Sequence, residues 1–310
     1  MNLRRLKYFV KIVDIGSLTQ SADVLHIAQP ALSQQIATLE SEFRQQLLVR
    51  TKRGVTPTEA GQTLYRHAQI ILRQFEQAKS DVNNAGKSLS GQVSVGLAPG
   101  TAASALALPL LKTIRARHPS ILLYLNENFG TTLSELVMNG RMDMAVLYAG
   151  KSVVHGLSYH PLLKEQLFLI APKGARRLPE KIALSEVGEL ELLLPRPYNY
   201  LRKYVDEAFS GLNTRAIVVA EIESAATLNA AVAAGLGATI LPESAARAMP
   251  ASIQAQLCRI VSPVIEVPLA LCASDHLPLS EPAQVVKDII LELVDSNDFD
   301  LGHSHSIEEN

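Results

Sequence analysis

Apolar residues near the start of the chain recur with the period of a helix. Leu6, Phe9 and Val13 lie three or four residues apart, and Gly16 follows soon after. This spacing places the apolar side chains on one face of a helix, and a glycine commonly ends one. The pattern predicts an amphipathic helix over residues 3–15 that stops at Gly16.

Two further helices are predicted after short breaks. The run Ser-Leu-Thr-Gln from Ser17 has the form of a capping box and predicts a helix over residues 18–25. Pro30 is expected as the first residue of the next helix, because its ring presets φ and its missing N–H would be unpaired there anyway. Two short helices joined by three or four residues match a helix-turn-helix, with the first helix completing its core.

The helix that starts at Pro30 has a polar face opposite its apolar one. Leu32, Ile36 and Leu39 are predicted to face inward. The remaining outer face is formed by Gln29, Ser33, Gln34 and Thr38. Amide and hydroxyl side chains of this length hydrogen-bond base edges in the DNA major groove. A solvated helix face is the alternative, and the adjoining helix-turn-helix pattern favours DNA.

A basic hairpin is predicted directly after this helix. Residues 47–50 and 55–56 have the composition of two short strands around a turn. Arg50, Lys52 and Arg53 are then placed to meet phosphates or a minor groove, as in the wing of a winged helix. The alternative is a solvated turn, and the position after a helix-turn-helix favours the wing.

A long helix is predicted over residues 57–89. Thr56-Pro57-Thr58-Glu59 has the form of a second capping box with Pro57 at the first helical position. A heptad seam runs through Leu64, Ala68, Ile71, Phe75, Ala78, Val82, Ala85 and Leu89. The helix that carries this seam would be about 50 Å long at ~1.5 Å per residue, too long for a small domain to cover, so the seam needs a partner helix. We expect a dimer formed through Leu64, Ala68, Ile71, Phe75 and Val82, which presents two reading heads to a two-fold DNA site.

Beyond residue 91 the pattern changes to alternating strands and helices. Strands are predicted at residues 92–97, 122–126, 144–148, 167–171, 191–194, 216–222, 238–241 and 267–273. Helices are predicted between them, at residues 106–117, 133–139, 200–209 and 228–234. This alternation predicts a largely parallel sheet with helices outside, in two units with a boundary near Leu163.

Composition indicates a soluble, cytoplasmic protein of two or three domains. The chain has 310 residues, 47% hydrophobic and 19% charged, and no apolar run long enough to span a membrane. Its first residues lack a secretory core. Cys258 and Cys272 are too few for a disulfide scaffold, and their apolar surroundings predict inert thiols and not a redox sensor. His303 and His305 lie in a polar tail that is expected to be disordered, with loose metal binding as the alternative.

Charge divides the chain into a basic end and an acidic body. Residues 1–90 carry 12 Lys and Arg against 7 Asp and Glu, a net charge of +5, and the remainder carries 17 against 23, a net charge of −6. Clustered basic charge favours phosphate binding, because each contact releases counterions condensed on the nucleic acid. The charge therefore supports DNA as the partner of the first ninety residues.

Two long motifs resemble one family. The run FxxxVxxGSLTQSADVLHIAQPALSQQIATLE, followed by LLVRTKRGVTPTEAG, resembles the DNA-binding end of LysR-type transcriptional regulators, and the remainder resembles their effector domain. The likeness covers residues 1–300. Within the family the chain is most similar to the nitrogen assimilation control subgroup, through HIAQPALSQQ, LLVRTKRGVTPTEAG, GLAPGTAAS and GATILPESAA.

The resemblance implies an α+β multidomain protein with a periplasmic-binding-protein-like effector domain. Its expected parts are a winged helix-turn-helix at 1–58, a linker and dimerisation helix at 59–90, an α/β effector domain of two Rossmann-like subdomains at 91–163 with 268–300 and at 164–267, and a disordered tail at 301–310. DNA contacts are implied for Gln29, Pro30, Ser33, Gln34, Arg50 and Arg53. Many relatives carry Arg at the position of Gln34 and Ser at that of Ala28, which changes the expected base preference.

An effector site is expected beyond the carboxyl ends of the strands, where helix N-termini present free donors. The segments 98–101, 130–132, 195–198 and 223–224 should lie there, and the candidate residues are Thr101, Thr131, Thr132, Pro195 and Ser224. The three threonines are also expected to cap their own helices. The effector implied by the resemblance is a small carboxylate or similar molecule.

The leading prediction is a DNA-binding regulator, as a homodimer or homotetramer. Its expected partners are double-stranded DNA, RNA polymerase and a small-molecule effector, with no cofactor, metal or membrane. No Ser/His/Asp, paired-carboxylate or Cys/His arrangement can be assembled by spacing, so an enzyme is not expected. The alternative is a cytoplasmic solute-binding protein with an accessory helical domain.

Overall fold

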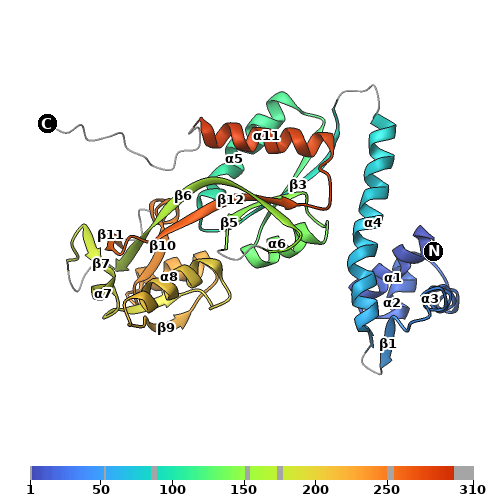
Figure 1. Cartoon of the computed structure of the whole chain (residues 1–310), viewed down its shortest axis with the longest axis horizontal. Helices are drawn as coiled ribbons and strands as arrows, with labels where there is room; N and C mark the ends of the chain where they lie inside the picture. The colour runs from blue at the N-terminus through green and yellow to red at the C-terminus, as the bar shows by residue number, and fades with distance from the viewer. Residues whose placement is uncertain are drawn as a thin grey trace. The chain divides into compact units, whose positions relative to one another are not determined.

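A computed structural model describes residues 2–51, 54–84, 89–150, 154–172, 177–249 and 255–296 of the chain (Figure 1). The chain forms two compact units. The N-terminal unit contains Met1–Lys87 with Asn139–Arg141, and the C-terminal unit contains Ser88–Met138 with Met142–Asn310.

The N-terminal unit is a winged helix-turn-helix followed by a long helix. Its elements are α1 (Leu3–Ile15), α2 (Leu18–Leu25), α3 (Gln29–Phe43), β1 (Leu48–Thr51), β2 (Gly54–Pro57) and α4 (Glu59–Asn84). The predicted bounds of α1 and α2 are confirmed. Gly16 ends α1 with φ of 72°, and the Ser17 hydroxyl accepts the Gln20 N–H at 3.3 Å, as the capping box predicts.

The two predicted proline starts differ from the structure. α3 begins at Gln29, so Pro30 is its second residue. The N–H groups of the first turn have no acceptor within the helix, so the missing N–H of Pro30 costs no hydrogen bond. The capping box at Thr56 is wrong, because Pro57 is the last residue of β2 and pairs with Leu48. Thr58 caps α4 instead, and its hydroxyl accepts the Gly61 N–H at 3.0 Å.

Two glycines let the wing approach the helices closely. A side chain at Gly54 would lie 2.5 Å from the Gly16 carbonyl oxygen, and one at Gly61 would lie 1.9 Å from the carbonyl oxygen of Leu47. The Val55 N–H donates to the Gly16 carbonyl at 2.7 Å in the same region. These approaches fix the hairpin against the ends of α1 and α4.

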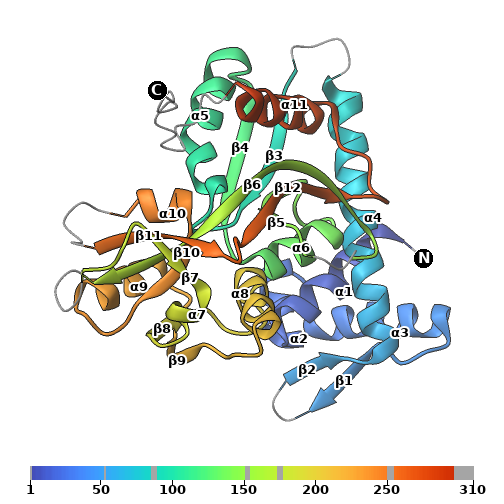
Figure 2. The same ribbon diagram turned by 60° about the vertical axis from the view of Figure 1, so that its left-hand side comes forward.

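The C-terminal unit is built on one large curved sheet (Figures 1 and 2). Within the described residues this sheet runs in the order β4 (Ile121–Glu127), β3 (Gly91–Leu97), β5 (Met144–Tyr148), β12 (Glu266–Ser274), β6 (Leu157–Pro172), β11 (Ala255–Ser262) and β7 (Lys181–Ala183). A further strand, β10 (Thr239–Pro242), pairs with β6. A smaller parallel sheet joins β8 (Glu191–Leu194) to β9 (Ile217–Glu221).

Helices pack on both sheets. They are α5 (Ala102–Arg117), α6 (Gly130–Met138), α7 (Leu184–Val187), α8 (Tyr200–Gly211), α9 (Ala225–Ala233), α10 (Glu243–Arg247) and α11 (Glu281–Asp295). The last helix, α11, packs against α5 and β3. The last described helix therefore packs on the half of the unit that contains its first strand, β3.

The expectation of a largely parallel sheet is wrong. β3 is parallel to β4 and β5, but β6 is antiparallel to β10, β11 and β12. The sequence pattern identified only residues 167–171 of β6, because the preceding part of this strand is mostly half-buried or exposed and lacks an apolar run. β11 and β7 were not predicted either.

The long strand β6 belongs to both halves of the C-terminal unit. Its first part pairs with β12 beside β3, β4 and β5, and its last part pairs with β10 and β11. Figures 1 and 2 show β6 and β12 running side by side between the halves. Residues on β6 are therefore placed to contact both halves.

Candidate functional sites

The outer face of α3 is polar and accessible. Gln29, Pro30 and Gln34 are exposed, and Ser33 and Thr38 are half-buried. On the opposite face Leu32, Ile36 and Leu39 have no exposed surface. The Thr38 hydroxyl donates to the Gln34 carbonyl at 2.9 Å, so its hydrogen is used within the helix. The structure therefore places all five predicted α3 residues away from the core.

The wing is bonded directly to this face. Arg50, an exposed residue of β1, donates from Nη2 to the Ser33 hydroxyl at 3.0 Å. The guanidinium thus lies beside the first half of α3. Lys52 and Arg53, predicted for the same role, lie outside the described residues.

Two residues that the sequence did not single out hold α3 in place. Glu40 on α3 accepts the N–H groups of Leu47 at 2.8 Å and Leu48 at 3.2 Å, which fixes the start of β1. Arg5 on α1 donates to the Gln35 side chain at 3.1 Å and forms an ion pair with Glu42. These bonds join residues 7–37 positions apart, so no local pattern signals them.

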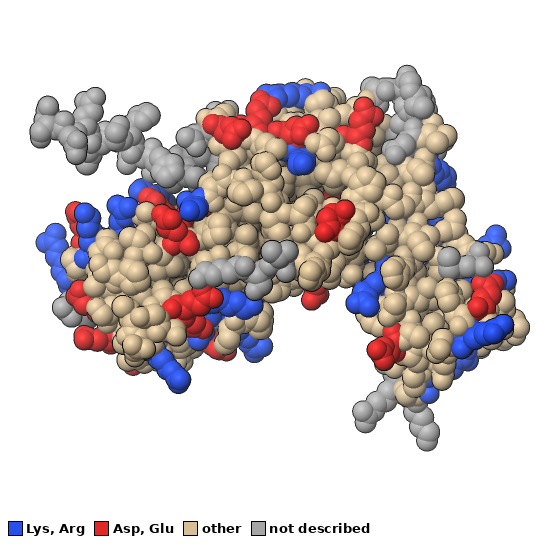
Figure 3. All heavy atoms as spheres, viewed as in Figure 1, with Lys and Arg blue, Asp and Glu red and all other residues tan. Residues whose placement is uncertain are grey.

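Basic side chains occur on the surface of the N-terminal unit. Figure 3 shows Lys and Arg at several places on this unit, with fewer acidic side chains between them. Arg4, Arg44 and Arg50 are exposed. Phosphate binding needs such cations on the face that meets the nucleic acid.

The predicted seam along α4 divides into a covered and an exposed part. Leu64 packs against the winged-helix core and Ala68 has no exposed surface. Ile71 is half-buried, whereas Phe75 is 45% and Val82 76% exposed. The apolar surface open to a partner therefore lies in the second half of the described helix. Ala85 lies outside the described residues, and the expectation for Leu89 is wrong, because Leu89 is not helical and packs against the core of the C-terminal unit.

Polar bonds attach α4 to α1. The Tyr65 hydroxyl bonds to the Asp14 carboxylate, and burial together with this carboxylate raises the pKa of Tyr65 to about 12. Lys7 on α1 pairs with Glu76 at 2.6 Å. The two contacts lie three turns apart on α4, so they fix the direction of this helix relative to α1.

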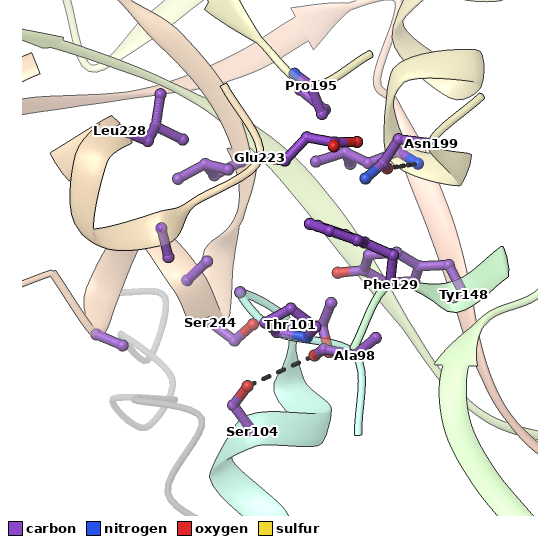
Figure 4. A pocket seen from close by; sticks show the side chains of 18 of the residues that line it. Ala98, Thr101, Ser104, Phe129, Tyr148, Pro195, Asn199, Glu223, Leu228 and Ser244 are labelled. Atoms are coloured by element: carbon purple, nitrogen blue, oxygen red, sulfur yellow. Dashed lines mark hydrogen bonds between the residues drawn. The ribbon is translucent and has the colours of Figure 1, made fainter. Parts of the chain in front are cut away.

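A cavity of about 570 Å³ opens within the C-terminal unit (Figure 4). Four of the five predicted effector residues line it, namely Thr101, Thr131, Pro195 and Ser224. Thr132 is not among the lining residues. The segments that carry the four come from the start of α5, the start of α6 and the loops after β8 and β9, as the strand-end argument predicts.

The capping roles of the cavity residues are only partly as expected. Thr101 caps α5, since its hydroxyl accepts the Ala103 N–H at 3.0 Å and donates to the Ala98 carbonyl at 2.8 Å. Ser224 caps α9 through the Thr227 N–H at 3.3 Å. Thr131 and Thr132 are not caps, because α6 already begins at Gly130.

Much of the remaining lining is apolar. Phe129, Ile222, Leu228, Leu241 and Met249 contribute side chains to the cavity. Phe129 and Leu228 lie on opposite sides of the space in Figure 4. An apolar cavity with a few placed polar groups is typical of small-molecule sites.

Glu165 on β6 lies beside this cavity and was missed by the sequence analysis. Its carboxylate accepts the Ala102 N–H at 3.0 Å, the Tyr148 hydroxyl at 2.8 Å, and both the N–H and the hydroxyl of Ser244. Tyr148 and Ser244 also line the cavity. Its partners lie 17 to 79 residues away, so sequence spacing gives no signal.

Comparison with known proteins decides the family. A model described as bacterial regulatory helix-turn-helix protein, lysR family, matches residues 3–62, and one described as LysR substrate binding domain matches residues 86–295. The chain belongs to the LysR family of transcriptional regulators. This LysR-type regulator has close relatives named nitrogen assimilation regulatory protein nac. The one from Klebsiella aerogenes is 56% identical over 95% of each chain, and that from Escherichia coli is 53% identical over 96% of each.

Solved LysR-family structures share the fold of the regulator. A full-length OxyR variant from Pseudomonas aeruginosa superposes with a TM-score of 0.71 at 25% identity, over 94% of this chain and 98% of that one. CbnR superposes with a TM-score of 0.68 at 20% identity, over 96% and 99% of the two chains. The predicted fold class and family are confirmed, and a solute-binding protein with an accessory helical domain is not favoured.

The cysteines of the regulator are buried. Burial raises the pKa of Cys258 and raises that of Cys272 to about 12, so both thiols stay protonated at neutral pH. No group of three or more metal-binding side chains occurs in the part of the chain that the structure describes. In that same part, no helix combines the length and apolar character needed to cross a membrane. His303 and His305 lie outside the described ranges.

Proposed function

We propose that this LysR-type regulator binds double-stranded DNA with the polar face of α3 in the major groove. Gln29, Pro30, Ser33 and Gln34 contact bases and backbone in this proposal, and Thr38 lies at the far end of the same face. The observation that carries it is the division of α3 into a fully buried apolar face and an accessible amide and hydroxyl face. Amides pair bidentately with adenine, whereas hydroxyls are less selective.

Arg50, Lys52 and Arg53 bind phosphates or the minor groove beside α3 in this proposal. The bond from Arg50 to Ser33 supports it, because it holds a cation next to the reading face without neutralising its charge. Phosphate contacts of this kind set the register of the protein on DNA and do not read sequence.

Two copies joined through α4 present two reading heads to a two-fold site. The exposed Phe75 and Val82, with Ile71 beside them, support this pairing. The corresponding domain division is 1–58 for DNA binding, 59–90 for the linker and dimerisation helix, and 91–300 for the effector-binding domain. The proposal also includes assembly into homotetramers and contact of the DNA-bound protein with RNA polymerase.

The genes controlled belong to nitrogen assimilation in this proposal. Its support is the name of the two relatives that are 56% and 53% identical over nearly the whole chain. The regulator then works in the cytoplasm and catalyses no reaction, in keeping with those relatives. The cavity at Thr101, Thr131, Pro195 and Ser224 takes a small molecule that adjusts DNA binding.

A gel shift tests the DNA-binding proposal. The full-length protein is mixed with DNA that flanks its own gene, over a series of salt concentrations. We expect the logarithm of the affinity to fall linearly with the logarithm of salt, because phosphate contacts release counterions. Affinity that is absent at low salt, or independent of salt, would contradict the proposal.

A further inference from the structure

Glu165 is a buried acid with only hydrogen-bond donors around it. The residue is 5% exposed. One oxygen, Oε2, accepts the Ala102 N–H and the Tyr148 hydroxyl, and the other, Oε1, accepts the N–H and the hydroxyl of Ser244. Each oxygen therefore has one backbone N–H, which can donate but cannot accept.

The donors come from both halves of the C-terminal unit. Ala102 is the first residue of α5 and Tyr148 the last of β5, in the half built on β3, β4 and β5. Ser244 belongs to α10, which follows β10 in the other half. In Figure 4, Ser244, Thr101 and Tyr148 lie along the same side of the pocket. Glu165 thus joins the two halves at the boundary of the cavity.

Tyr148 remains a donor to this carboxylate over a wide pH range. Burial, with the neighbouring Glu165 carboxylate as a second cause, raises the pKa of Tyr148 well above its usual value. The other donors to Glu165 are the Ala102 N–H and the N–H and hydroxyl of Ser244.

The start of α5 is therefore already occupied. The first N–H groups of a helix attract anions, and in an open site they would bind a ligand carboxylate. Here the Ala102 N–H is bonded to Glu165, the Ala103 N–H to the Thr101 hydroxyl, and the Ser104 N–H to the Thr101 carbonyl. A second carboxylate could bind these three N–H groups only by displacing hydrogen bonds that the protein already makes.

Several other polar side chains of the cavity are already paired or carry negative charge. Asn199 and Ser224 are used as caps of α8 and α9. Arg247 is the one Lys or Arg among the described lining residues, and it pairs with Glu243 at 2.7 Å. Glu223 adds a further carboxylate to the lining.

We propose that Glu165 supplies from within the chain the carboxylate that an anionic ligand would bring to the start of α5, and that it thereby excludes small carboxylates from this site. Glu165 is then a residue that determines specificity and holds the two halves together. The inference deepens the proposed function, since it rests on the cavity as the ligand site. It replaces the expectation of a carboxylate effector with that of a molecule without a free carboxylate at α5.

Chemical rescue tests this role in the full-length protein. Glu165→Ala removes the carboxylate and leaves space, so we expect the melting temperature of the C-terminal unit to fall by on the order of 5–10 °C. Sodium acetate should then raise the melting temperature of the variant, whereas sodium chloride at the same ionic strength should not. The wild type and the surface variant Glu266→Ala should respond equally to the two salts.

Several results would overturn the proposal. The first is a Glu165→Ala variant with the melting temperature of the wild type. The second is a rise in the melting temperature of the variant that is equal in acetate and in chloride. The third is a rise in the melting temperature of the wild type in acetate but not in chloride. If Glu165→Ala does not fold, hydrogen exchange of Glu165→Gln replaces the test, with faster exchange expected at the Ala102 and Ser244 amides and unchanged exchange as the contrary result. The gel shift on the wild type is independent, so a failure there concerns DNA binding and not Glu165.

Discussion

The contact between Arg50 and Ser33 connects charge to sequence reading at the scale of single residues. Arg50 is exposed, yet its guanidinium is held 3.0 Å from a hydroxyl on the reading face of α3. In the proposed complex, a phosphate bound there would be fixed in position relative to the bases that α3 is proposed to contact. The orientation of the Arg50 guanidinium, and not only its charge, therefore contributes to the proposed DNA binding.

Arg50→Ala should weaken binding to all DNA sequences alike. The variant removes one phosphate contact, so the slope of log affinity against log salt should become shallower by about 1. Gel shifts over a salt series measure both quantities. Lys181→Ala removes an exposed charge on β7 in the other unit and should leave the slope unchanged. A loss confined to one sequence would contradict the assigned role.

Gly61 should be intolerant of any side chain. A Cβ there would lie 1.9 Å from the Leu47 carbonyl oxygen, which is backbone and cannot move without shifting the wing. We expect Gly61→Ala to lower the free energy of unfolding of the N-terminal unit by roughly 3 kcal/mol. Gly211→Ala, with open space around it, should change stability by less than about 0.5 kcal/mol. Equal effects in chemical denaturation would refute this explanation.

The same residues show where sequence reasoning ends. The faces of α3 follow from its apolar period, so its candidate contacts could be named from sequence. Glu40 and Glu165 could not, because each bonds to groups that are close only after the chain has folded. A buried carboxylate in the middle of a strand has no distinctive spacing.

At the scale of elements, periodicity found most helices and strands but missed α7, α10 and α11 among the helices and β7 and β11 among the strands. α1 and α2 have the predicted bounds because Gly16 and Ser17 mark the boundary between them. The start of α4 was misplaced because the pattern at Thr56 and that at Thr58 both resemble caps, and only the pairing of Pro57 with Leu48 distinguishes them. β6 was underestimated because it crosses between two halves and alternates in burial along its length.

The exposed part of the α4 seam predicts an effect on assembly. Phe75→Glu places a charge in the centre of the proposed contact, where it would be buried without a partner. We expect the variant to dissociate to monomers at micromolar concentration, whereas the wild type sediments as a dimer or tetramer. Gln62→Glu, an exposed position near the start of the same helix, serves as the control. Sedimentation of the wild type as a monomer would remove the dimer from the account.

At the scale of the whole molecule, two units with different chemistry are joined in one chain. The N-terminal unit carries an accessible polar helix face with cations nearby. The C-terminal unit carries a largely apolar cavity, and the two halves of this unit share β6. A ligand that changes how the halves meet would also act on the hydrogen bonds that Glu165 makes to both halves. In the proposed dimer, such a change alters the spacing of two reading heads, which sets affinity for a two-fold site.

The base preference of Gln34→Ala tests the central claim most directly. Wild type and variant are titrated against a set of operators in which each base pair is replaced in turn. If α3 reads the major groove, the variant should lose discrimination at one base pair in each half-site, by about 1–3 kcal/mol, and keep it elsewhere. A uniform loss of affinity at every operator, or an unchanged preference, would contradict the account.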